Sequence, residues 1–136
     1  MPVKKKKKKT VKYWKTKIDK VFHEYIRRRD VNEHGFGKCI CCNKPLKFDE
    51  SDAGHFMGRQ YMNTRWNEDN VNIQNRKCNR FEYGNQYAYS KALGKKKAEE
   101  LQALSRISIK LMDFEYQEIF DKFDQKLKDL KASQAF

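Results

Sequence analysis

The chain has 136 residues, of which 38% are hydrophobic and 36% charged, and its formal net charge at pH 7 is +13. This length fits one domain, and so small a core gains stability from a staple such as a bound metal. We find neither an apolar run of membrane-spanning length nor the apolar segment of a signal peptide. We therefore expect a cytoplasmic protein with reduced thiols, in which clustered cysteines indicate a metal site rather than disulfides.

Positive charge is concentrated in residues 1–97, which hold 25 Lys and Arg against 10 Asp and Glu, whereas residues 98–136 hold 6 against 8. A localised positive field favours nucleic acid as a partner, and an anionic membrane less, because no basic helix with a broad apolar face is present. A lysine run predicts a disordered arm over residues 1–10, either a solvated tail or a nonspecific contact to DNA or RNA. The run consists of Lys4, Lys5, Lys6, Lys7, Lys8 and Lys9.

The first predicted element is a helix over residues 11–31, because apolar residues recur there at helical spacing and the polar stretch 30–37 contains glycine. We expect Trp14 and Tyr25 to lie in the core rather than on a base-stacking surface. The basic residues that close the helix either stabilise its C-terminus or contact nucleic acid. They are Arg27, Arg28 and Arg29.

Residues 38–94 are predicted to hold short elements around a cysteine turn. The turn lies between two extended pieces, the segment ending at His55 reads as a strand entering a loop, and Val71–Gln74 leads into a helix that begins near Cys78.

Residues 95–132 are predicted to be helical. A short helix over 95–104 would turn Ala98, Leu101 and Leu104 inward, and Ser108 would cap a last helix from Ile109 to about Lys131. The apolar stripe of that last helix would either cover the first helix or pair with its copy in a dimer, and the pattern favours neither.

Three cysteines have the spacing of a zinc site. Cys39-x2-Cys42 is a good first knuckle and Cys78 belongs to a second, but Asn75 stands where a second knuckle would have its other cysteine. Cys41 and His34 are alternative fourth ligands. Three explanations remain open: an unusual zinc site, a degraded site that still packs, or no zinc.

A histidine and several oxygen-bearing side chains lie around these cysteines and suit phosphodiester hydrolysis. His55 has the pKa range of a general base, and Asp52 and Asn79 offer the oxygen ligands that Mg²⁺ or Mn²⁺ accepts. Glu82 follows Asn79 by three residues on a helix and is a further candidate for the metal. Asn70 would hydrogen-bond the loop backbone so that His55 points at the attacking water.

The motifs C-I-C-C-N-K-P-L, D-A-G-H-F, R-W-N-E-D-N and Q-N-R-K-C-N-R-F-E-Y-G-N of residues 39–85 closely resemble the NinG/Rap family of phage recombination proteins. The resemblance extends outward over most of residues 13–131. It implies an endonuclease specific for branched DNA such as Holliday junctions and D-loops, acting in homologous recombination, and placed in the cytoplasm of a host cell if the protein is phage-encoded.

The resemblance also implies a core of the His-Asn-His, or ββα-metal, superfamily. The expected fold is therefore α+β and mainly helical, with that core over 38–94 flanked by an N-terminal helix and C-terminal helices in one nuclease domain over 11–136. His55 would be the general base, Asn70 the middle asparagine, and Asn79 a metal ligand as in endonuclease VII-like resolvases. Gly54 stands where many superfamily members carry a metal-binding aspartate, and Asp52 is the residue expected to take over that role.

The leading hypothesis is thus a divalent-metal-dependent endonuclease that works as a homodimer, because symmetric cutting of a four-way junction needs two sites. The alternative is a non-catalytic, zinc-stapled protein that binds branched DNA and recruits other recombination proteins, and a weaker one is an RNA-binding protein. The basic residues expected to hold phosphates are the lysine arm and Arg27, Arg28, Arg29, Arg59, Arg65, Arg76, Lys77 and Arg80.

Overall fold

The computed structural model describes residue 3 and residues 8–136, and within them it is mixed α+β and mainly helical, as expected. Lys4–Lys7 of the predicted arm lie outside the described residues. The elements in chain order are α1 (Val11–Arg29), β1 (Phe36–Lys38), β2 (Pro45–Lys47), η1 (Phe48–Glu50), β3 (Ser51–His55), α2 (Met62–Arg65), β4 (Val71–Asn75), η2 (Lys77–Phe81), α3 (Gln86–Leu93), α4 (Lys95–Ser105) and α5 (Asp113–Ser133).

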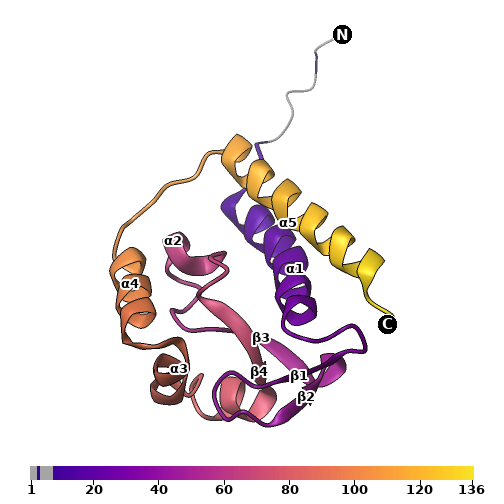
Figure 1. Cartoon of the computed structure of the whole chain (residues 1–136). Coiled ribbons are helices and arrows are strands. Elements are labelled where there is room, and N and C mark those ends of the chain that lie inside the picture. The colour runs from indigo at the N-terminus through magenta and orange to yellow at the C-terminus, as the bar shows by residue number, and fades with distance from the viewer. Residues whose placement is uncertain (1–2, 4–7) are drawn as a thin grey trace.

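The two long helices, α1 and α5, lie side by side and run in the same direction (Figure 1). Near their N-terminal ends Trp14 donates to Asp113, and near their C-terminal ends Glu24 pairs with Lys131. The main apolar cluster lies between them and includes Trp14, Ile18, Phe22, Tyr25, Ile26, Tyr116, Phe123 and Leu127. In this structure the apolar stripe of the last helix therefore covers the first helix, and Trp14 and Tyr25 are core residues as predicted.

The last helix starts later than predicted. It begins at Asp113, after Met112, whose backbone N–H donates to the Glu115 carboxylate at 2.7 Å. Acidic groups at the first turn favour a helix start here because they complement the helix dipole. Ser108 lies instead in an extended linker whose Ile107 is exposed. Ile107, Ile109 and Met112 of this linker imitated the helical pattern although they are exposed, whereas Leu111 packs against the main apolar cluster.

The helix α4 matches its predicted span closely, and Ala98 and Leu101 face inward. Leu104 does not, because 38% of its surface remains exposed. The two buried residues pack with Phe56 and Tyr89 in a separate cluster beside α3. A small hydrophobic unit thus supports the far end of the β3–β4 segment.

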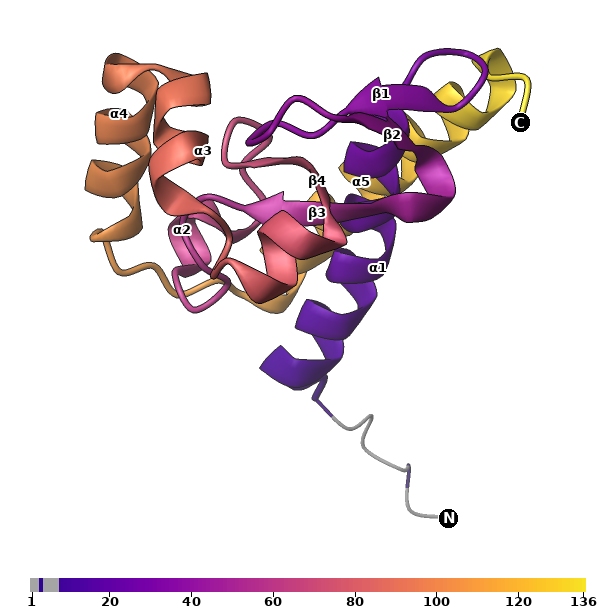
Figure 2. The same cartoon turned by 90° about the horizontal axis from the view of Figure 1, so that it is seen from below.

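Two antiparallel strand pairs link these helical parts. In the pair β3–β4, Ser51 faces Asn75 and His55 faces Val71, so His55 ends its strand as the sequence predicted. The pair β1–β2 lies beside the cysteine turn. Seen from below, η2 and α3 lie on the β3–β4 side of the molecule, whereas α5 lies behind α1 (Figure 2). Within the described residues, we find no helix both long and apolar enough to span a bilayer.

Candidate functional site

A cavity of about 560 Å³ lies on one side of the β3–β4 pair and is open to solvent. It is bounded by α1, β3, the loop after β3, η2 and the turn that follows η2. Three of the residues predicted for catalysis or metal binding line it together: Asp52, His55 and Asn79. Residues from separate motifs therefore meet at one cavity, next to the cysteine turn.

His55 is held by the loop that follows it. Its Nε2 lies 2.9 Å from the backbone carbonyl oxygen of Arg65, which assigns the ring hydrogen to Nε2 and leaves Nδ1 as the acceptor. Burial, together with the neighbouring His23, lowers the pKa of His55 to about 4. The imidazole is therefore neutral near pH 7, with a lone pair at Nδ1.

Asn70 has the loop-anchoring position that the sequence suggested. Its side chain is fully buried. Its Oδ1 accepts from Met57 N–H at 2.8 Å, and its Nδ2 donates to the carbonyl oxygens of Met57 at 2.9 Å and Thr64 at 3.0 Å. The loop that carries the Arg65 carbonyl is thus fixed from within, and with it the acceptor that orients His55.

Asp52 is the centre of a second polar group on the cavity wall. One of its carboxylate oxygens accepts from Asn79 Nδ2 at 3.0 Å, and Arg80 donates to both oxygens at 3.0 and 3.1 Å. Because Asn79 donates through its nitrogen, its Oδ1 and the Asp52 carboxylate form an adjacent pair of hard oxygen donors. Such a pair suits Mg²⁺ or Mn²⁺, although Arg80 competes for the carboxylate.

Glu82 does not join this group. It lies outside the cavity and pairs with Lys77 at 3.8 Å. The segment η2 is a π-helix, which winds more loosely than an α-helix, so residues three apart no longer lie above one another. The prediction that Glu82 lies at the metal assumed α-helical spacing between Asn79 and Glu82, and this assumption was wrong.

The three predicted zinc ligands lie together. The Sγ atoms of Cys39, Cys42 and Cys78 are all within 4.8 Å of one another, which makes them a possible metal-binding group. The hydrogen bond with the neighbouring Cys41 thiol lowers the pKa of Cys39 to about 4. Three sulfur ligands at this separation suit a soft cation such as Zn²⁺.

Asn75 lies where the fourth ligand was sought. Its Nδ2 is 3.0 Å from Cys42 Sγ, and its Oδ1 accepts from Cys78 N–H at 2.8 Å. Neither alternative completes the group: Cys41 neighbours Cys39 but its Sγ accepts from Gln74 and lies outside the three-cysteine group, and His34 is exposed and pairs with Glu33. The amide of Asn75 thus closes the knuckle by hydrogen bonds, where a fourth cysteine would have closed it through the metal.

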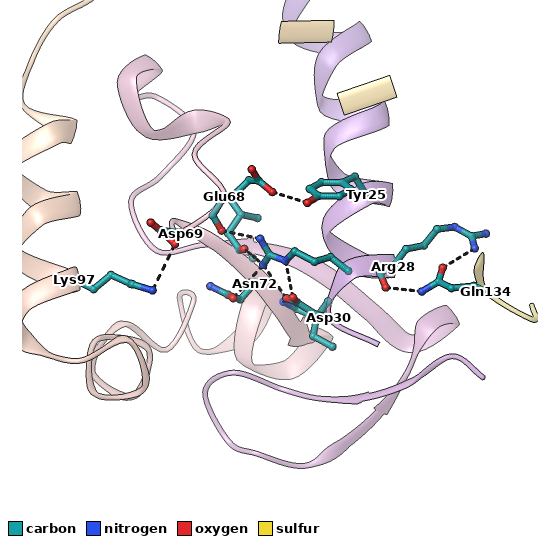
Figure 3. A network of polar contacts seen from close by, with 12 residues as sticks. Tyr25, Arg28, Asp30, Glu68, Asp69, Asn72, Lys97 and Gln134 are labelled. Carbon is teal, nitrogen blue, oxygen red and sulfur yellow. Dashed lines mark hydrogen bonds and ion pairs between the residues drawn. The ribbon is translucent and has the colours of Figure 1, made fainter. Parts of the chain in front are cut away.

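The arginines divide into internal and cavity-lining groups. Arg65 is 8% exposed and donates to Asp19 and to the carbonyl oxygen of Arg59, and Arg29 bonds Asp30 and the carbonyl oxygens of Glu68 and Val71. Figure 3 shows Asp30, Glu68 and Asn72 gathered in this network. The prediction of phosphate contacts by Arg29 and Arg65 is therefore not supported, because these guanidinium groups hold the fold together.

The remaining basic residues keep part of their surface free. Arg27, Arg59 and Arg80 line the cavity, and Arg27 also donates to the Phe48 carbonyl oxygen at 2.9 Å. Arg28 bonds Gln134 near the C-terminus. Arg76, Lys77, Lys8 and Lys9 are exposed, and Arg76 reaches the carbonyl oxygen of Asp49.

His23 is a cavity residue that the sequence interpretation missed. Its ring lies edge-on to His55 with 5.4 Å between ring centroids, and its buried Nε2 has no hydrogen-bond partner among the described residues. Burial lowers its pKa despite the nearby Asp19 carboxylate. The signal was present: Asp19, His23 and Arg27 are spaced four apart and so share one face of α1.

The sequence was compared with known proteins. The model of the family described as Bacteriophage Lambda NinG protein matches residues 1–133. No curated protein and no solved structure matches the chain.

Proposed function

The chain belongs to the NinG family, and from that premise we propose that it is a divalent-metal-dependent endonuclease for branched DNA in phage recombination. The observation that supports this most is the meeting of His55, Asp52 and Asn79 at one open cavity lined by arginines. A general base, oxygen donors for a cation and cationic groups for phosphates are the parts that phosphodiester hydrolysis needs.

In the proposed reaction, His55 accepts a proton from water at Nδ1 while the Arg65 carbonyl keeps the other nitrogen protonated. Asn70 maintains this orientation by fixing the loop. Asp52 and Asn79 would hold Mg²⁺ or Mn²⁺, which supplies positive charge to the phosphate and the leaving oxygen. Arg59 and Arg80 would hold neighbouring phosphates, and Arg80 would leave Asp52 for DNA when the cation binds.

Zinc would be structural in this scheme. Cys39, Cys42 and Cys78 join the turn before β2 to the helical segment after β4, and both parts border elements of the cavity. A cation at these thiolates would stabilise the placement of Asn79, which directly follows Cys78. In a chain with so small a core, metal binding of this kind contributes directly to folding.

We also propose that two copies act on a four-way junction, since one site cuts one strand. The apolar stripe of α5 is covered by α1, so this stripe is not available for the dimer contact considered above. Exposed apolar residues around the start of α5 offer another surface, namely Ile107, Ile109, Met112 and Phe114.

A second candidate function is a non-catalytic protein that binds branched DNA for other recombination proteins. The specific observation in its favour is the double hydrogen bond from Arg80 to Asp52, which neutralises the carboxylate that a cation needs. The basic residues at the cavity would serve binding equally well without cutting.

The two functions are separated by incubating a labelled four-way junction, and a linear duplex of the same sequence, with Mg²⁺, Mn²⁺ or EDTA. We expect metal-dependent nicking of the junction, lost in His55→Ala with binding retained. His34→Ala is the matched control, because His34 is exposed and lies away from the cavity. Tight junction binding without cutting in either metal would leave the non-catalytic function.

A further inference from the structure

Three large aromatic side chains are exposed within a short segment beside the cavity. Phe81 is 77% exposed, Tyr83 94% and Tyr87 73%. Tyr83 itself lines the cavity, and the elements that carry the other two, η2 and α3, lie next to β3 (Figure 2). Exposed apolar side chains gathered in one short segment mark an interaction surface more often than scattered single ones do.

The turn between η2 and α3 carries Tyr83, the most exposed of the three rings. Tyr83, Gly84 and Asn85 all have positive φ, a costly conformation for the two residues that are not glycine. Gly84 is buried, and its carbonyl oxygen accepts from Gln74 Nε2 at 2.8 Å. The turn is thus tied to β4 through Gly84, while the Tyr83 side chain stays in solvent between the exposed Phe81 and Tyr87 of the flanking helices.

The surroundings of the rings are basic. Arg80 and Lys77 lie in η2, and Lys91 Nζ is 4.5 Å from the centroid of the Tyr87 ring. Arg59 and Arg80 also line the cavity that Tyr83 borders. A ligand that fits both features carries negative charges at regular intervals and flat apolar faces between them, which describes single-stranded nucleic acid.

We propose that Phe81, Tyr83 and Tyr87 form a stacking platform for unpaired DNA bases adjacent to the strand that enters the cavity. Bases within intact duplex stack on one another and cannot reach such a platform, whereas bases at a branch or a single-stranded flank can. The assignment to DNA rests on the proposed function. It adds the feature of the substrate that the site recognises: unpaired bases, read by stacking and without sequence preference.

The test measures binding in EDTA, so that it does not depend on cleavage. The probes are oligo(dT) with one internal 2-aminopurine, whose fluorescence reports stacking, and a linear duplex of mixed sequence. We compare wild type with Tyr83→Ser and Tyr87→Ser, both highly exposed and so expected to fold normally. Phe36→Ser is the control, because Phe36 is 54% exposed in β1, outside this segment, and does not line the cavity.

Stacking on an aromatic side chain contributes about 1–3 kcal/mol per base, so each Tyr variant should bind the oligonucleotide roughly 5- to 150-fold more weakly. Duplex affinity and the salt dependence of binding should not change, because phosphate contacts remain, and Phe36→Ser should match wild type on both probes. Equal losses on both probes, or no loss on the oligonucleotide and no 2-aminopurine response, would refute the platform. Because the binding test contains no metal, a failed cleavage assay does not affect the evidence for the platform. A failed binding test likewise does not affect the evidence for cleavage.

Discussion

Replacing Gly54 by alanine should destabilise the protein through one neighbour, Gln74. A Cβ at position 54 would lie 1.7 Å from Gln74 Oε1 and 2.5 Å from its Cδ. Gln74 has no exposed surface, and its Nε2 donates to the Gly84 carbonyl oxygen at 2.8 Å and to Cys41 Sγ at 2.9 Å. The methyl group can enter only if this buried side chain moves and breaks those bonds.

The cost follows from two contributions. Overpacking of a tight interior costs typically 1–3 kcal/mol, and a buried polar group left without its partner costs about 1–3 kcal/mol. Since moving Gln74 relieves the clash but gives up its bonds, the two contributions partly replace each other. We therefore expect Gly54→Ala to lower the free energy of unfolding by about 2–4 kcal/mol, and the larger Gly54→Asp by more.

The assay is urea unfolding followed by circular dichroism, on a double-mutant cycle of Gly54→Ala with Gln74→Ala. Shortening residue 74 makes room for the methyl group, so the double variant should be more stable than the sum of the single effects predicts, by at least about 1 kcal/mol. Gly58→Ala is the matched control. Its Cβ would meet only the end of the exposed Gln60 side chain, 2.2 Å away, which can swing into solvent.

A Gly54→Ala variant as stable as Gly58→Ala would refute this reasoning, and so would strict additivity in the cycle. The result also bears on metal ligation. In the proposed His-Asn-His core an aspartate would be expected at position 54, and here Gln74 occupies the space that its side chain would need. This geometry explains why Asp52, two residues earlier, is the carboxylate at the cavity.

Three further results are expected. Burial lowers the pKa of His55 to about 4 from an ordinary 6.5, so as pH falls the unfolded chain binds a proton at His55 before the folded protein does. The wild type should therefore lose about 3 kcal/mol of stability as pH falls from 6.5 to 4. His55→Gln should flatten that slope in urea titrations run at each pH, and an unchanged slope would contradict the burial argument. Asn70→Ala removes three hydrogen bonds of a fully buried side chain and should cost about 2–4 kcal/mol in the same unfolding assay, more than Gln102→Ala at an exposed position of α4. Cys42→Ser should lose bound zinc and melt lower, whereas Cys41→Ser should keep it, as measured by metal analysis and thermal unfolding; equal zinc in both variants would exclude the three-cysteine group.

Predictions from the sequence were most accurate where the residue pattern is set by a single helix, strand or turn. The apolar spacing of residues 14–26 fixed the first helix and its buried face, because periodicity within a helix is set by the helix itself. The short spacing from Cys39 to Cys42 likewise predicted a metal-binding turn, and the structure places Cys78 beside it. His55 at the end of its strand was also foreseeable, from the short extended segment before it.

Prediction was weakest where the outcome depends on contacts between elements. Nothing local to Arg65 reveals that Asp19, on α1, will bind its guanidinium group. Glu82 was misplaced because no sequence rule signalled a π-helix after β4. His23 was missed because a histidine on a helix becomes a site residue only when a distant segment, here the end of β3, packs against it.

The pairing of α1 with α5 has a consequence for biosynthesis. The main core joins the beginning of the chain to its end, so it cannot close until the last helix has left the ribosome. At about 5–20 residues per second, several seconds pass between the emergence of the two helices. During that interval the apolar face of α1 lacks its cover, and a nascent chain arrested before residue 113 should remain a substrate for chaperones and proteases.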